Sequence, residues 1–297
     1  MSRHWFEQRE RGTPFALRLI LWIALHLGRT VARSVLYPIT LYFYLTAEDQ
    51  RESSRAYLRR VLERQPGRWQ ILRHIHCFAA TILDRVFLLS DRLQGFDIRI
   101  HDTDLLLERM DAGRGCILLG SHLGSFEVLR ALASRRRHFP LKVLMYPEHN
   151  RSITGILETL NPEVADTVIP LGEVDSLIAV ADNLREGWAV GMLGDRAAAG
   201  DRVTSCRFLG GEVSFPVGPF LLAAATGAPL ILFFGLYQAG ARYDIHFELL
   251  SERVELDRSR REEQIRRLTQ RYADRLAHYT RQTPYNWFNF FDYWNEH

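Results

Sequence analysis

The chain has 297 residues, of which 47% are hydrophobic and 25% are charged. This balance is typical of a globular protein and excludes a disordered chain, a collagen-like chain and a multi-span membrane protein as the main description. The formal net charge is +3, but residues 1–73 hold 13 arginines against six acidic residues. The basic character is therefore concentrated near the N-terminus.

The longest apolar stretch covers residues 15–45 and is interrupted by Arg18, His26, Arg29 and Arg33. A spanning helix needs about 20 largely uncharged residues, and a central arginine costs roughly 2.5–3.5 kcal/mol on insertion scales. Two shorter segments with aromatic residues beside arginines suit the headgroup region of an anionic membrane, although a pair of buried core helices would have the same pattern. These two segments are 19–27 and 35–45.

Residues 51–90 show helical periodicity, with a break at Pro66-Gly67. From residue 116 onward, short apolar runs alternate with helix-like stretches, which favours an α/β fold with a mostly parallel sheet flanked by helices. The apolar runs are 116–119, 141–146, 167–171, 189–193 and 230–236. The helix-like stretches are 125–134, 151–160, 174–186 and 216–226.

An alternating strand is predicted at 242–250, followed by an amphipathic helix at 258–282. The aromatic segment 285–294, YNWFNFFDYW, either packs back on the domain or forms a lipid-facing surface, and packing is the favoured interpretation. We therefore expect an N-terminal membrane-associating extension, residues 1–50, and an α/β domain, residues 51–297.

Three cysteines without C-x-x-C spacing indicate neither a disulfide framework nor a zinc knuckle, and the sequence has no metal-ligand spacing. We expect a cytosol-facing protein with no bound metal or cofactor. The basic segment is interleaved with apolar residues and carries no nucleic-acid motif, so we expect no nucleic-acid partner.

The segment 115–132, GCILLGSHLGSFEVLRAL, is the most informative for chemistry. A buried strand runs into a loop that holds His122, at the position where open α/β sheets bind ligands. If Ser125 caps the following helix, a reversal at Gly124 brings the carboxylate of Glu127 to the imidazole. Such a carboxylate fixes the tautomer and leaves the other ring nitrogen as a general base, although an ordinary polar contact at a helix start would use the same residues.

The motif H-L-G-S-F-E, a histidine and an acid separated by four residues after a hydrophobic strand, resembles the signature of the lysophospholipid acyltransferase superfamily. Within it, the chain is similar to the late acyltransferases of lipid A biosynthesis, the lauroyl and myristoyl transferases. The resemblance covers most of the chain and includes three later blocks. These are Gly194-Asp195-Arg196, Phe208-Leu209-Gly210-Gly211 and Phe215-Pro216-Val217-Gly218-Pro219.

The resemblance implies that His122 deprotonates an acceptor hydroxyl and that Glu127 orients the imidazole. The hydroxyl then attacks the thioester of an acyl carrier protein or coenzyme A directly, without an acyl-enzyme. The acyl chain is a fatty or aryl-polyene-type chain, and the acceptor is a lipid or glycolipid. The expected location is the cytoplasmic face of the bacterial inner membrane, held peripherally or by a single N-terminal anchor.

Four further residues are predicted to bind substrate, namely Ser125, Arg151, Asp195 and Arg196. Arg151 falls where the superfamily places an acceptor-binding arginine, although a surface arginine at a helix entry fits as well. Arg196 stands where the lipid A enzymes typically carry glutamine. It can pair with an acceptor phosphate, with the pantetheine phosphate of the donor or with Asp195. Backbone amides near Gly194 or Ser125 are candidate oxyanion donors.

Two other functions fit the same sequence. A thioesterase would use the same dyad to activate water and would act without an acceptor. A lipid-binding protein would keep the fold without turnover, so its lipid association would be independent of His122 and Glu127.

Overall fold

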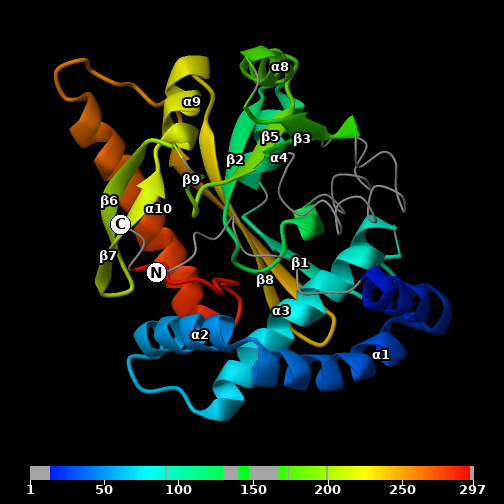
Figure 1. Cartoon of the computed structure of the whole chain (residues 1–297). Helices are drawn as coiled ribbons and strands as arrows, with labels where there is room; N and C mark the ends of the chain where they lie inside the picture. Colours follow the sequence, from blue (N-terminus) through cyan, green and yellow to red (C-terminus); the bar gives the residue numbers. More distant parts are fainter. Residues whose placement is uncertain are drawn as a thin grey trace.

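The computed structural model describes residues 14–90, 92–102, 104–129, 140–146, 166–172, 174–198 and 200–294. Its centre is a seven-stranded sheet with the strand order β1-β9-β8-β2-β5-β3-β4 (Figure 1). Every neighbouring pair is parallel except β8 with β9, so the predicted mostly parallel α/β fold is confirmed. The strands are β1 Asp97–His101, β2 Cys116–Gly120, β3 Leu141–Met145, β4 Val168–Pro170, β5 Ala189–Leu193, β8 Leu230–Ala239 and β9 Arg242–Ser251.

Helices cover both faces of the sheet. Alternate residues of a strand point to opposite sides, so one strand contributes to two cores. Ile117 and Leu119 of β2 join one core with residues of α8, α9 and α10, whereas Cys116 and Leu118 join a second core with residues of α1 and α3. The helices are α1 Pro14–Thr46, α2 Glu48–Val61, α3 Arg68–Leu89, α4 Asp104–Asp111, α8 Val174–Arg185, α9 Gly218–Thr226 and α10 Arg261–Gln282. The sheet is therefore covered on both faces, and its edge strands are β1 and β4.

Four elements were not expected from the sequence, namely β1, α4 and the two strands of a hairpin. The edge strand β1 has alternating half-exposed residues and no fully buried one, so it lacks the apolar run that marks the central strands. A separate antiparallel hairpin, β6 Val203–Phe208 and β7 Gly211–Pro216, packs against α10. Its turn includes Leu209 and Gly210, both with positive φ. The predicted helix at 151–160 lies outside the described residues.

The N-terminal helix α1 is bent at Gly28, whose φ of 83° lies outside the helical region. The bend separates the two apolar segments expected from the sequence. The helix packs along α3 at the base of Figure 1, on the opposite side of the molecule from α8 and α9. Residues 18–46 are long and apolar enough to cross a membrane by length and composition.

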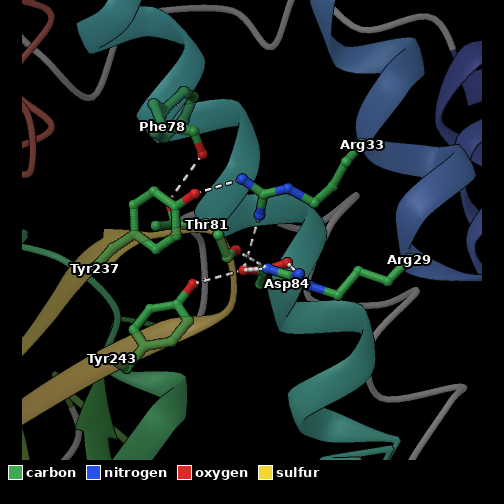
Figure 2. Close-up of polar contacts among 8 residues, drawn as sticks. Arg29, Arg33, Phe78, Thr81, Asp84, Tyr237 and Tyr243 are labelled. Carbon is green, nitrogen blue, oxygen red and sulfur yellow. Dashed lines mark hydrogen bonds and ion pairs between the residues drawn. The ribbon is translucent and has the colours of Figure 1, made fainter. Parts of the chain in front are cut away.

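Two arginines that interrupt the apolar stretch point into the protein. Figure 2 shows Arg29 and Arg33 of α1 reaching Asp84 of α3. Arg29 bonds both carboxylate oxygens at 2.8 Å, and Tyr243 donates its hydroxyl to the same carboxylate at 3.0 Å. Arg33 also donates to the hydroxyl of Tyr237. Asp84 is fully buried. A buried ionic cluster therefore joins α1 to α3, and Tyr237 of β8 and Tyr243 of β9 take part in it.

The aromatic segment after α10 packs back on the domain, as favoured from the sequence. The side chains of Trp287, Phe288, Phe291, Tyr293 and Trp294 are all buried. An isolated bridge joins Trp287 to Leu123, in the loop after β2. The segment therefore lies against the loop that carries the predicted base.

Candidate active site

The candidate site lies where two neighbouring parallel strands end. In the register of β2 and β5, Gly120 is paired with Leu193. The residues that follow, His122 and Asp195, therefore emerge at the same edge of the sheet. This is the edge at which open α/β sheets bind their ligands.

His122 and Asp195 are joined by two hydrogen bonds. The imidazole Nδ1 lies 2.8 Å from Asp195 Oδ1, and the backbone N–H of His122 donates to Oδ2 at 3.0 Å. Because an ionised carboxylate only accepts, Nδ1 carries the proton and Nε2 is left with a free lone pair. The His122 side chain is 30% exposed, whereas that of Asp195 is fully buried.

The electrostatics of the pair favour an ionised acid and a neutral base. Burial alone would raise the pKa of Asp195, but His122, Arg196 and the indole N–H of Trp287 together lower it to about 2. Burial and the positive charges of Arg196 and Arg85 lower the pKa of His122, against the raising effect of Asp195. The imidazole is therefore neutral at neutral pH and can accept a proton.

The loop between His122 and the next helix is fixed by a close contact of two backbones. Gly124 has a φ of 75°, and a Cβ at this position would lie 1.9 Å from the carbonyl oxygen of Gly235 on β8. Only glycine fits here. The N–H of Gly124 donates to Asn286 O at 2.9 Å, and that of Ser125 donates to Gly235 O at 2.8 Å.

The two backbone amides suggested as oxyanion donors are already bonded. The N–H of Ser125 donates to Gly235 O, as above, and the N–H of Gly194 donates to Gly120 O at 3.1 Å. Neither is free for a substrate oxygen in this conformation. The Ser125 side chain is buried.

The remaining predicted residues are placed as follows. Glu127 is half-buried in the first turn of the helix that follows the loop, while the imidazole Nδ1 is held by Asp195, which the sequence had assigned to substrate binding. The role of Glu127 as the orienting acid stays a prediction. Arg196 donates to Phe288 O at 2.5 Å and stacks on the ring of Phe291. Arg151 lies outside the described residues.

Sequence reasoning missed the contribution of the aromatic segment. The indole Nε1–H of Trp287 donates to Asp195 Oδ2 at 2.9 Å, and the Tyr293 hydroxyl donates to the backbone carbonyl of Asp195 at 2.6 Å. The N–H of Phe288 donates to His122 O at 3.0 Å. The run of aromatics was visible in the sequence, but nothing in it indicated which residue would reach the acid.

The comparison with known protein families identifies the family of the chain. The family model described as bacterial lipid A biosynthesis acyltransferase matches residues 5–296. The chain belongs to this family. No curated protein matches the chain.

As a lipid A biosynthesis acyltransferase family member, the chain is an acyltransferase with a lipid-type acceptor and an acyl thioester donor. Within the part of the chain that the structure describes, no group of three His, Cys, Asp or Glu side chains could hold a metal ion.

Replacing Trp287 by Phe is expected to lower kcat about 10-fold and to leave KM for the acyl donor unchanged. The ring is kept, but Asp195 Oδ2 loses one of its two donors, and a hydrogen bond to a charged group contributes about 1.5–3 kcal/mol. Steady-state acyl transfer measures both constants. The control is Trp294→Phe, whose indole donates to Phe208 O instead. An equal loss of kcat in both variants would show that the effect is only structural.

Proposed function

We propose that this lipid A biosynthesis acyltransferase family member transfers a fatty or aryl-polyene-type acyl chain from an acyl carrier protein or coenzyme A thioester to a hydroxyl of a lipid or glycolipid. The observation that carries the proposal is the His122–Asp195 pair at the strand ends. The Nδ1 atom of His122 is held by the buried carboxylate of Asp195, and the Nε2 lone pair is left to accept a proton.

In the proposed reaction, His122 Nε2 accepts the proton of the acceptor hydroxyl as its oxygen attacks the thioester carbonyl carbon. The imidazolium that forms is stabilised by the adjacent Asp195 carboxylate. The C–S bond then breaks, and the imidazolium returns its proton to the leaving thiolate. His122 thus accepts one proton and returns it. Because the acceptor oxygen attacks the thioester directly, no acyl-enzyme forms.

The roles of the other predicted residues are also part of this proposal. Glu127 is proposed as a second acid beside the base, and Ser125, Arg151 and Arg196 as substrate-binding residues. The exposed part of the His122 side chain marks the point at which the acceptor hydroxyl and the thioester must meet.

We infer that α1 lies on the cytoplasmic face of the bacterial inner membrane. The bend at Gly28 gives two halves, and at roughly 1.5 Å per residue neither half reaches the roughly 30 Å of a hydrocarbon core. Residues 14–46 hold no acidic residue, and the outer face is apolar and aromatic, which suits an interfacial helix. Its exposed large side chains are Leu19, Trp22, Leu27, Val31, Tyr37, Leu41, Tyr42 and Leu45.

The test combines two products in one assay. Purified protein in detergent is mixed with an acyl carrier protein thioester or an acyl-coenzyme A, with or without a membrane-lipid extract, and free thiol and acylated lipid are followed together. We expect thiol release that depends on the extract, a matching new lipid ester, and neither product with His122→Ala.

Three outcomes would contradict the proposal. Equal thiol release without the extract, and no new ester, would assign a thioesterase. No release from any donor would assign a lipid-binding protein. Full transfer by a normally folded His122→Ala protein would remove His122 from the mechanism.

A further inference from the structure

Arg85 of α3 is a half-buried arginine that the proposed chemistry does not use. Its Nε atom is buried and has no hydrogen-bond acceptor among the described residues. No carboxylate, carbonyl or aromatic ring in the described part of the chain is bonded to its guanidinium. Buried polar groups are almost always paired, so an arginine left in this state suggests a ligand outside the protein chain.

The neighbouring acid does not neutralise Arg85. Asp84 precedes it on α3, but consecutive helix residues point about 100° apart. The carboxylate of Asp84 is already occupied by Arg29, Arg33 and Tyr243, as Figure 2 shows. The positive charge of Arg85 is therefore not neutralised by Asp84.

Arg85 lies on the face of α3 that is turned toward the candidate active site. His74, Phe78 and Arg85 share one helix face, since they are separated by four and seven residues. The imidazole of His74 stacks on the ring of Phe288. The ring of Phe78 makes an edge contact with the same ring, with 5.4 Å between the two centroids. Phe288 in turn bonds His122 through its N–H and Arg196 through its carbonyl.

Two positive charges therefore act on the imidazole from different elements. Arg196 follows β5 and Arg85 belongs to α3, and both lower the pKa of His122. Guanidinium groups bind phosphate oxygens through paired N–H donors, and a phosphate beside them would also offset the unpaired charge.

We propose that Arg85 is an anion-binding residue of the active site, and that it binds a phosphate group carried by one of the two substrates. The inference rests on the proposed function. The phosphate comes either from the headgroup of the acceptor lipid or from the phosphopantetheine arm of the donor. Both sources offer the same tetrahedral oxyanion, so the experiment separates them.

The test compares wild type, Arg85→Gln and Arg68→Gln with substrates that differ only in the phosphate. Arg68 is an exposed arginine at the other end of α3 and serves as the matched control. The donors are an acyl-phosphopantetheine and the corresponding acyl-pantetheine. The acceptors are a phosphorylated lipid and its dephosphorylated form.

We expect Arg85→Gln to raise KM at least 10-fold for one phosphate-bearing substrate, and to leave KM for its phosphate-free form within about 2-fold. The substrate affected identifies the source of the phosphate. Arg68→Gln should behave as wild type. Unchanged KM for both phosphate-bearing substrates, or an equal rise for the phosphate-free forms, overturns the inference.

Calorimetric binding of phosphopantetheine and of the phosphorylated lipid gives a readout that does not require turnover. Arg85→Gln should weaken binding of one of them about 10-fold at an unchanged melting temperature. Unaltered binding of both overturns the inference. Failure of the proposed function would appear differently, as the absence of acceptor-dependent, His122-dependent transfer in the wild-type protein.

Discussion

Replacing Asp195 by Asn is expected to lower kcat of acyl transfer by about 10⁴-fold, because the substitution reverses the tautomer of His122. The carboxylate accepts a hydrogen bond from Nδ1–H at 2.8 Å and leaves the Nε2 lone pair for the acceptor hydroxyl. An amide can donate its NH₂ to Nδ1 instead, which places the imidazole proton on Nε2. The base is then blocked although the shape of the site is retained.

The measurement is acceptor-dependent transfer in the Asp195→Asn protein, beside Glu127→Gln. Nitrogen-15 NMR of labelled histidine reports the tautomer directly. The geometry predicts a change of tautomer with Asp195→Asn and none with Glu127→Gln. If Asp195→Asn stays within 10-fold of wild type while Glu127→Gln loses about 10⁴-fold, the orienting acid is Glu127 and the geometric assignment is wrong.

Replacing Asp84 by Ala is expected to destabilise the protein by about 3–5 kcal/mol, the range measured when one partner of a buried ion pair is removed. Two guanidinium groups with side chains about 20% exposed would lose their carboxylate, and the Tyr243 hydroxyl would lose its acceptor. We expect the melting temperature to fall by about 10 °C.

Thermal unfolding in detergent, followed by circular dichroism, tests this expectation. The control is Asp97→Ala, which removes a carboxylate from the Arg99 ion pair on β1, where both side chains are about half exposed. Exposed pairs contribute little, so the control should melt with wild type. Equal melting temperatures for the two variants would show that the buried cluster does not hold α1.

A combined replacement of Arg29 and Arg33 by Met and Asp84 by Leu separates charge from packing. Removing all three charges leaves no unpaired ion, so this variant is expected to be more stable than Asp84→Ala.

The division of the chain at residue 50 stays a prediction, but the cluster joins α1 closely to the rest of the protein.

The elements that periodicity could predict are those with a continuous apolar run or a clear helical face. Strands β2, β5 and β8 are buried on both faces, and α10 has one apolar side, so each was expected near its observed position. The polar strand β1 and the hairpin β6–β7 lack such runs. Their stability comes from partners distant in sequence, which local pattern does not contain.

The same limit explains which part of the site could be predicted. His122 was found because its motif is local, directly after β2. Its partner Asp195 is 73 residues away and reaches it only because β5 is the neighbour of β2 in the sheet. Trp287 is a further 92 residues along the chain from Asp195. Strand order and the path of the aromatic segment decide both contacts.

The position of Trp287 and Tyr293 in the chain has a consequence for synthesis. All strands of the sheet are translated before residue 286, and domains fold as units while translation proceeds. A nascent protein can therefore assemble its sheet while Asp195 still lacks the indole and phenol donors that hold it. Products of premature termination before residue 287 would carry His122 and Asp195 without the indole and the phenol that bond Asp195. We expect such unfinished chains to be poor catalysts of acylation.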